Sequence, residues 1–265
     1  MAHFPQLRSG AAGQYPMVKM RRTRTARNTG SDGHTYKLAD PAAEEITWEL
    51  RYKGLSDAEW QAIASLFEEC EGRLGTFVFP DPTANLLCNS EDCEAEQWRA
   101  DPLITVAGGV ADPAGGSNAQ RLSNNSQASQ SIGQTIAAPA SLWYCFSLYA
   151  RGSQAMTISL EIACASAAES KECSVTPAWR RLQVAANLGA AEPETEFRIH
   201  LPAGATVEVY GIQAEAQPSA SAYKKTATRS GVYAAARFAD DSLTVVTEGP
   251  DCHSTVVRIV GGREE

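Results

Sequence analysis

The chain has 265 residues, enough for one large domain or for two ordinary domains that each bury a core. Its formal charge of −8 and its pI near 5.1 argue against a wrapped nucleic-acid partner, because phosphate binding needs a basic face. No apolar run is long enough to span a membrane, and MAHFPQLRSG lacks the apolar stretch of a secretory signal, so we expect synthesis in a cytoplasm.

Basic residues gather near the N-terminus, between residues 15 and 37, among threonines and ahead of the turn sequence NTGSDG. A patch for nucleic acid would interleave aromatic side chains for stacking, and none interrupts the basic run from 19 to 27. We therefore expect an amphipathic strand and loop whose long side chains meet acidic neighbours. The next segment, ITWELRY from Ile46 to Tyr52, alternates apolar and polar residues and predicts a half-buried strand.

One helix is strongly indicated directly after this strand. Ser56 followed by Glu59 forms a capping box ahead of an apolar stripe, and the pattern ends near Gly72. A short strand within GTFVFPDP follows and stops at Pro80 and Pro82, because proline cannot serve inside a sheet ladder. The order strand, helix, strand predicts a compact α+β unit.

From about Leu86 the pattern becomes that of an all-β sandwich, with short alternating runs separated by Gly, Pro, Ser and Asn. The expected strands are 142–151, 155–163, 178–186, 195–204 and 205–215. Three further alternating runs, 231–238, 241–249 and 254–262, come after this sandwich would be complete.

The seven cysteines are an odd number, so at least one thiol is unpaired within a monomer. Two interpretations of these residues are open. Either disulfides join Cys88 to Cys93 and Cys164 to Cys173, or the cysteines are buried reduced thiols. The four histidines are scattered and no zinc-type cysteine spacing occurs, so we expect neither metal nor cofactor.

Several motifs of the central region resemble a jelly-roll module of the carbohydrate-binding type. They are NLL from Asn85, a following Trp98, and the segments YCFSLYAR, VTPAWRRL, LPAGATVEVYGIQAE and SAYKKT. Such modules occur in polysaccharide-degrading enzymes and in tail proteins of bacteriophages. The resemblance implies a β-sandwich over 86–222.

The first 85 residues, above all DPAAEEITWELRYKGLSDAEWQAIASLFEECEGRLGTFVFPDP, resemble distal tail or baseplate hub proteins of long-tailed phages. That resemblance implies a ring-forming α+β domain that docks under the tail tube. A unit of 85 residues with one helix is small, so we assign the last strands to it: 1–85 plus 223–265 form a split α+β domain, and 86–222 is inserted. The fold class is therefore mainly β with one main helix.

The leading hypothesis for function is a structural subunit of a phage tail tip, a distal tail or hub ring in the virion. Its expected partners are further copies in a homohexameric ring, the tail tube, and other baseplate or fibre proteins. The alternative is a glycan-binding adhesin or receptor-binding protein. No catalytic motif is present, and Glu161 and Glu208 are explained by a solvated face, so we predict no enzyme activity.

Two sets of residues are candidates for binding. Outward aromatic and hydrogen-bonding side chains of the sandwich could hold cell-surface glycan, or could pack against a neighbouring domain or subunit: Trp143, Tyr149, Trp179, Arg198, His200 and Tyr210. Charges of the split domain could join subunits or pair within one chain: Arg21, Arg22 and Arg24 against Glu44, Glu45, Asp240 and Asp241.

Overall fold

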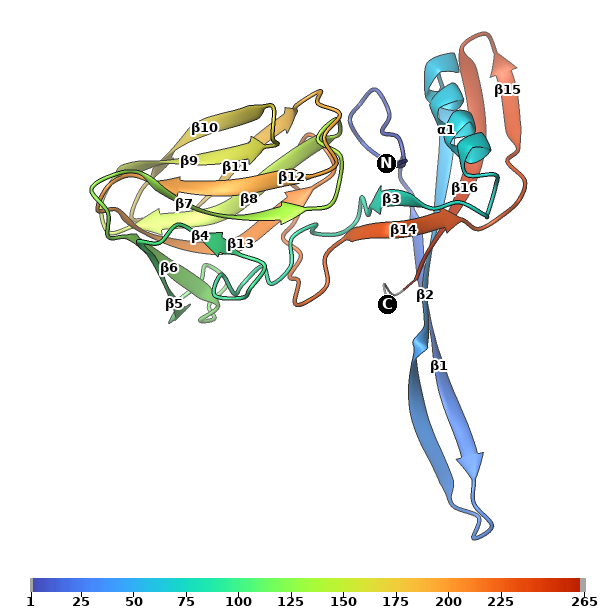
Figure 1. The fold of residues 1–265 in the computed structure, drawn as a ribbon, viewed down its shortest axis with the longest axis horizontal. Helices are drawn as coiled ribbons and strands as arrows, with labels where there is room; N and C mark the ends of the chain where they lie inside the picture. The colour runs from blue at the N-terminus through green and yellow to red at the C-terminus, as the bar shows by residue number, and fades with distance from the viewer. Residues whose placement is uncertain (1, 263–265) are drawn as a thin grey trace. The chain divides into compact units, whose positions relative to one another are not determined.

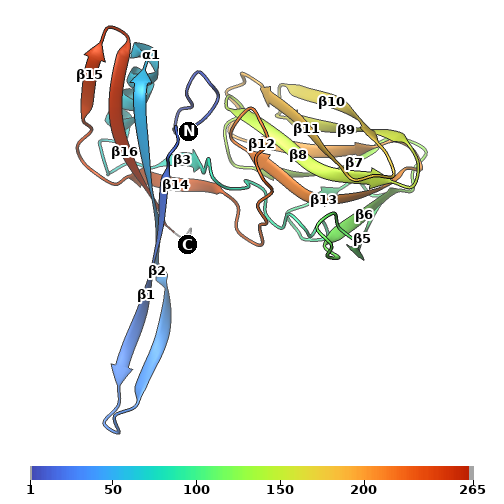
Figure 2. The ribbon, with the colours of Figure 1, turned by 180° about the vertical axis from the view of Figure 1, so that it is seen from behind.

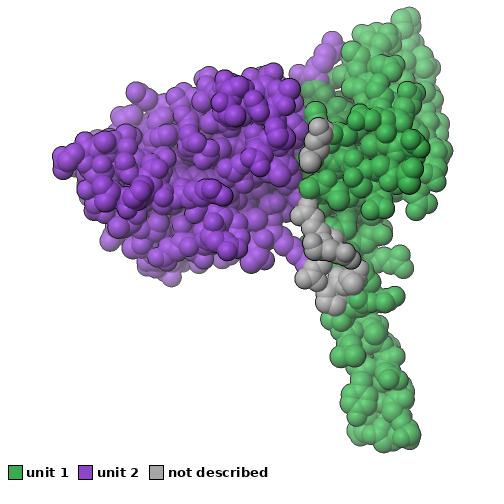
Figure 3. All heavy atoms as spheres, viewed as in Figure 1, with its two compact units in different colours: residues 1–7, 13–79, 233–265 green, residues 8–12, 80–232 purple. Residues whose placement is uncertain are grey.

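The structure is a computed structural model that describes residues 2–262, without the side chains of Pro41 and Ala42. It separates into two compact units, coloured in Figure 3. Unit 1 comprises Met1–Leu7, Gly13–Phe79 and Tyr233–Glu265, and unit 2 comprises Arg8–Ala12 and Pro80–Val232. Within the described range, no helix is long and apolar enough to cross a bilayer.

Unit 1 is built on a six-stranded sheet of order β1-β2-β16-β14-β3, with β15 paired to β16 (Figure 1). Its strands are β1 (Val18–Thr29), β2 (Thr35–Leu55), β3 (Phe77–Pro80), β14 (Val232–Phe238), β15 (Val245–Gly249) and β16 (Cys252–Gly262). The pairing of β16 with β2 is antiparallel and places Val257 opposite Leu50 and Ile259 opposite Trp48. One sheet therefore contains strands from both chain ends.

The helix α1 (Asp57–Glu69) begins at the predicted capping box, with Ser56 as the N-cap. The Ser56 hydroxyl accepts from the Glu59 backbone N–H, and the Glu59 carboxylate accepts from the Ser56 backbone N–H at 3.0 Å. Its apolar side contributes Ile63 and Leu66 to the core of unit 1. The centre of that core is Trp48, fully buried, with ring centroids 5.0 Å from Phe79 and 4.6 Å from Tyr233.

The outer part of β1 and β2 forms a free two-stranded ribbon (Figures 1 and 2). In the described residues β16 accompanies β2 as far as Glu45, and from the Arg24–Asp40 pair to the Thr29–Thr35 pair no other described strand pairs with β1 or β2. All twelve residues of β1 are exposed. The sequence predicts a strand and loop here, but it does not predict that β2 is 21 residues long.

Unit 2 is a β-sandwich of two five-stranded sheets, so the chain is mainly β with one helix in the described residues. The β9–β12 sheet has the order β10-β9-β12-β7-β4, and the β8–β13 sheet has the order β11-β8-β13-β6-β5. The first contains β4 (Arg99–Ala100), β7 (Gln130–Ile136), β9 (Met156–Ala163), β10 (Ala168–Val175) and β12 (Thr195–Leu201). The second contains β5 (Ile104–Val110), β6 (Ala119–Asn124), β8 (Trp143–Gly152), β11 (Arg180–Asn187) and β13 (Thr206–Glu215).

The core of the sandwich is filled from the inner sides of both sheets, as the alternation predicts. Phe197 of β12 is fully buried, and its ring lies 5.7 Å from Tyr144 and 5.5 Å from Phe146, both on β8. The Tyr144 hydroxyl donates to the Pro139 carbonyl at 2.9 Å, which satisfies its one buried polar group.

The two ends of unit 2 are joined by backbone hydrogen bonds. The N–H of Asp81 donates to the Gly231 carbonyl at 2.8 Å, and the N–H of Gly231 donates to the Asn85 carbonyl at 2.9 Å. The two ends of unit 2 therefore lie close together, as the ends of many domains do.

Replacing Phe197 by alanine should lower the free energy of unfolding of the sandwich by about 3–5 kcal/mol, because it opens a cavity between the two sheets. Denaturant titration followed by circular dichroism measures the change. Glu169→Ala, an exposed position on β10, is the control and should stay within about 0.5 kcal/mol of the parent protein. A similar loss from both variants would contradict the assignment of Phe197 to the core.

Candidate functional site

The six residues that the sequence predicts for glycan binding lie on both sheets of the sandwich. Trp143 and Tyr149 are on β8 and Tyr210 is on β13, and Trp179 directly precedes β11, so these belong to the β8–β13 sheet. Arg198 and His200 are on β12 in the β9–β12 sheet. The alternation identifies all six as facing away from the core, but two strands of opposite sheets cannot contribute to one outer face.

The outer side of the β8–β13 sheet presents what we call the aromatic face, formed by Tyr149, Arg151, Trp179, Glu208 and Tyr210. Its first cross-strand row is ionic: Glu208 accepts from Arg121 at 2.8 Å and from Arg151 at 2.6 Å. The Arg151 guanidinium also lies over the Trp179 ring, 4.8 Å from its centroid. The row therefore fixes both the carboxylate and the indole through one arginine.

The second row is aromatic. Tyr149 and Tyr210 are directly opposite in the ladder between β8 and β13, with ring centroids 6.2 Å apart. The Tyr223 ring lies 5.3 Å from Tyr210 on one side, and the Arg181 guanidinium lies 5.5 Å from Tyr149 on the other. The rings of Tyr149 and Tyr210 are half-buried, so each is held in place and still meets solvent.

A β-bulge in β13 determines which residues of this strand lie on the outer side of the sheet. The register against β8 shifts between Tyr210 and Gln213, and Gly211 in between has a φ of +62°. A Cβ at Gly211 would lie 3.2 Å from the Tyr223 ring, so glycine also permits that close approach. Beyond the bulge, Ile212 is buried and Gln213 lies opposite Ser147. Without the extra residue of the bulge, the side chains of Ile212 and Gln213 would each point to the other side of the sheet.

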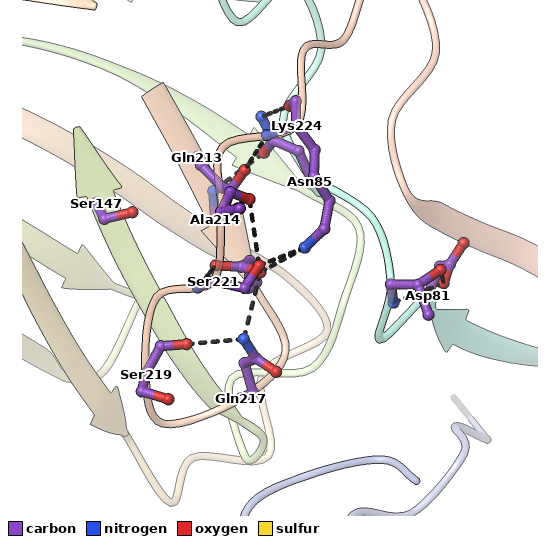
Figure 4. Close-up of polar contacts among 12 residues, drawn as sticks. Asp81, Asn85, Ser147, Gln213, Ala214, Gln217, Ser219, Ser221 and Lys224 are labelled. Atoms are coloured by element: carbon purple, nitrogen blue, oxygen red, sulfur yellow. Dashed lines mark hydrogen bonds and ion pairs between the residues drawn. The ribbon is translucent and has the colours of Figure 1, made fainter. Parts of the chain in front are cut away.

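The segment from 217 to 224, which we call the strap, follows β13 and is bonded back to it (Figure 4). Lys224 donates to the buried Glu215 carboxylate at 2.8 Å, and its backbone N–H donates to the Gln213 side chain at 2.7 Å. The Ser221 N–H donates to the same carboxylate at 2.9 Å. Asn85 donates to the Lys224 carbonyl at 3.2 Å and accepts from the Ala214 N–H at 3.1 Å. Figure 4 shows Asn85, Gln213, Ser221 and Lys224 close together.

Charges and burial set the protonation of three groups at this site. Burial raises the pKa of Tyr210, and the carboxylates of Glu91 and Asp112 add to the effect, so its phenol keeps its proton. Burial would also raise the pKa of Glu208, but the hydrogen bonds from Arg121 and Arg151 outweigh it and lower that pKa. The same balance, with Lys224 and Ser221 as the donors, lowers the pKa of Glu215.

The opposite face, on the β9–β12 sheet, is polar and ionic. Arg198 donates to Glu196 and, at 3.2 Å, to Glu161, and these two carboxylates raise the pKa of Arg198. His200 Nε2 lies 3.3 Å from Glu161. A hollow of about 370 Å³ adjoins this network and has no aromatic lining: Thr135, Cys164, Ala165, Glu192, Pro193, Glu194, Glu196 and Arg198. Because no described residue of this lining offers a ring to stack on a sugar, the hollow lacks one half of a glycan site.

Trp143 lies apart from the aromatic face, at the start of β8 and 37% exposed. Its indole packs on Gly10 so closely that a Cβ there would be 2.9 Å from the ring. Three residues are missing from the sequence prediction. Arg151 lies two residues after Tyr149 on β8, so alternation could have found it, whereas Arg181 and Tyr223 become neighbours of the tyrosines only through sheet order and the strap.

The candidate interface charges of unit 1 find partners within the chain. Arg21 lies 3.3 Å from Glu44, and Arg24 Nε donates to Asp40 at 2.8 Å. Asp240 lies 3.5 Å from Arg258, and Asp241 accepts from the Arg73 N–H at 3.1 Å. Arg22 is opposite Glu45 in the ladder between β1 and β2.

All seven cysteines lie in the described residues, and all are free thiols. The buried thiols are inert, since burial raises the pKa of Cys145 to about 11 and also raises the pKa of Cys93 and Cys173. Of the two alternatives for these residues, the structure has reduced thiols.

Comparison with known proteins finds no matching family model and no matching curated protein. Among solved structures, the chain is similar to the C-terminal family 22 carbohydrate-binding module of Clostridium thermocellum Xyn10B, at 15% identity, with 54% of this chain and 99% of that chain covered and a TM-score of 0.43. It is also similar to the CBM22-1 xylan-binding domain of Paenibacillus barcinonensis Xyn10C, at 13% identity, 52% and 96% coverage and a TM-score of 0.41.

A third similar structure is the enzymatically active domain of tailspike protein 4 of bacteriophage CBA120, at 13% identity and a TM-score of 0.40. That likeness covers 52% of this chain and 22% of the tailspike chain. At such identities a likeness concerns the fold and does not extend to a ligand.

Replacing Glu215 by glutamine should loosen the strap and lower the free energy of unfolding of unit 2 by about 2 kcal/mol at neutral pH. Breaking a buried ion pair costs about 3–5 kcal/mol, and Lys224, 33% exposed, recovers part of that from water. Because the pKa of Glu215 is lowered from 4.5, its contribution is present above that value and is lost as the pH falls below it. The difference between the two proteins should therefore shrink in acid.

Urea titrations from neutral pH to below pH 4.5 measure the difference in the free energy of unfolding, and amide hydrogen exchange of 217–224 measures the loosening of the strap. Glu172→Gln, at an exposed position on β10, is the matched control. Unchanged exchange of the strap in Glu215→Gln would contradict the role of this carboxylate.

Proposed function

We propose that unit 2 is a carbohydrate-binding module that holds a polysaccharide chain on the aromatic face. The observation that carries this proposal is the juxtaposition of two cross-strand rows, one of half-buried tyrosines and one of a carboxylate fixed by two arginines. Pyranose rings present an apolar face of C–H groups and a rim of hydroxyls, so a site needs both kinds of group on one surface.

Each row has a defined part in this binding. Tyr149, Tyr210 and Trp179 offer ring surface to the apolar faces of successive sugar units. Glu208, ionised because its pKa is lowered, accepts from hydroxyls with its remaining lone pairs, and Arg121, with a half-exposed side chain, donates to them. The Tyr210 phenol keeps its proton and donates as well.

We expect binding without hydrolysis. A glycosidase needs a carboxylic acid of raised pKa facing a second carboxylate. On the aromatic face the carboxylate is Glu208, and its pKa is lowered by Arg121 and Arg151, which makes it unsuited to protonate a leaving group.

Replacing Tyr149 or Tyr210 by alanine should reduce the affinity for the cognate polysaccharide about tenfold or more, because each removes a stacking surface from the centre of the site. Affinity gel electrophoresis against a panel of soluble polysaccharides identifies the ligand, and titration calorimetry gives the affinity. Arg198→Ala and His200→Ala, on the opposite sheet, are the controls and should bind as the parent protein does.

The same four variants test whether the site lies instead on the β9–β12 sheet. Loss of binding in Arg198→Ala and His200→Ala with retention in the tyrosine variants would move the site to the β9–β12 sheet. Absence of affinity for every polysaccharide of the panel would contradict the module itself.

We also propose that the inserted domain is an autonomous folding unit, of which 86–222 is the main part. The wider bounds 80–232 are favoured, because Asn85 and Lys224 both take part in the hydrogen bonds that hold the strap. An excised 80–232 segment should therefore melt in a two-state transition, and a segment that stays unfolded would contradict this proposal.

A second candidate function is that of a structural subunit of a phage tail tip, in a homohexameric ring that meets the tail tube and displays the module on the virion. What favours an assembly role is the ribbon of β1 and β2, which is exposed on every side in unit 1. Copurification of the protein with tail tube protein from lysed host cells tests this role.

A further inference from the structure

The free ribbon of unit 1, residues 24–40, is here called the arm. It carries Arg24, Arg27 and Lys37 against Asp32 and Asp40, in a chain whose formal charge is −8. A two-stranded ribbon without further cover is marginally stable in water. The arm also keeps the long outer edge of β1 unpaired, and exposed edges of this length are templates for association.

The two sides of the arm differ in character. Leu38 lies opposite Ala26 and Tyr36 lies opposite Asn28, so one side carries two large apolar side chains that are 67% and 60% exposed. On the other side Arg27 lies directly opposite Lys37. Like charges opposite each other destabilise a ladder, and no described residue forms an ion pair with either of these two. The arm thus has an apolar side and a cationic side, and both are exposed in the described part of the chain.

The end of α1 has the opposite properties. Glu68, Glu69 and Glu71 are exposed there, no basic residue occupies the last turn, and no described residue forms an ion pair with them. Carboxylates at a helix C-terminus face the negative end of the helix dipole, which costs stability unless a cation is near. The exposed Arg73 follows them, so residues 68–74 carry three carboxylates against one cation.

We propose that the cationic side of the arm of one copy of this protein docks on the end of α1, at Glu68, Glu69 and Glu71, of a second copy. Arg27 and Lys37 face these carboxylates, whereas Tyr36 and Leu38, on the other side of the arm, take no part in this contact. An arm cannot make this contact with its own helix, because the ribbon extends from the sheet away from α1 in both views (Figures 1 and 2).

The contact is heterologous, with a different surface on each copy, and so it can continue from copy to copy. Symmetric pairing of two β1 edges is disfavoured, since it would bring Arg21, Arg22, Arg24 and Arg27 of both copies together. This inference deepens the assembly role and is independent of sugar binding.

Sedimentation velocity of the full chain at low and at high ionic strength tests the proposal. The protein should associate at low ionic strength and dissociate at high ionic strength, because exposed charges are screened by salt. Arg27→Glu with Lys37→Glu keeps the like-charge pair on the arm and reverses only its sign, and should weaken association about tenfold or more. Glu68→Lys with Glu69→Lys should weaken it to the same extent.

Combining the four substitutions should restore association, because the charges again oppose each other. Arg99→Glu with Lys171→Glu, exposed on the sandwich, is the matched control and should associate as the parent does. Far-ultraviolet circular dichroism and an unchanged polysaccharide affinity confirm that each variant is folded and separate this test from that of the binding module.

The proposal is overturned if the parent protein is monomeric at low ionic strength, if either pair of reversals leaves association intact, or if the combined variant stays apart. Binding of a DNA duplex or of anionic vesicles by the arm of a protein that remains monomeric would assign the arm to another partner and would also overturn it.

Discussion

The antiparallel pairing of β16 with β2 is the constraint on which the arrangement of unit 1 depends. It places Ile259 opposite Trp48 and Val257 opposite Leu50, and so completes the sheet surface against which α1 packs. Neither strand could bury its apolar side without the other, because Trp48, Leu50, Val257 and Ile259 share one core. The chain must therefore leave this sheet after β3 and return to it at β14, and residues 80–232 fold in the interval. The backbone hydrogen bonds of Gly231 with Asp81 and Asn85 hold the two ends of that interval together.

The features of the fold that follow from local sequence could be predicted, and those that follow from tertiary pairing could not. The capping box at Ser56 and Glu59 located α1, and the alternation in Ile46–Tyr52 located the buried part of β2. Strands β5 to β7 lie among Gly, Ser and Gln and lack a clear apolar period, and β10 buries only Cys173 and Val175. Their strand character comes from their neighbours, which supply the ladder that the residues themselves do not specify.

The candidate site could also be predicted from the sequence only in part. Alternation assigned Tyr149, Tyr210, Arg198 and His200 to outer faces, but a period of two gives only inside and outside. Which outer face a residue joins depends on strand order, and that order puts β8 and β13 in one sheet and β12 in the other. The bulge at Gly211 was equally hidden, although it decides that Gln213 and not Ile212 lies beside the tyrosines. A glycine inside an apolar strand is the one sequence signal for it.

The two surfaces that we propose to be functional differ in whether their charges are paired within the chain. On the aromatic face Glu208 is bonded to Arg121 and Arg151, so the charges hold side chains in place and the rings are left to meet a ligand. On the arm Arg27 faces Lys37, and at the end of α1 the glutamates have no cation in the last turn. Paired charges preorganise a site that an uncharged ligand can use, whereas unpaired charges of opposite sign on one chain favour association with another copy of that chain. A mutation on the aromatic face should thus affect binding chiefly through geometry, and one on the arm chiefly through its sign.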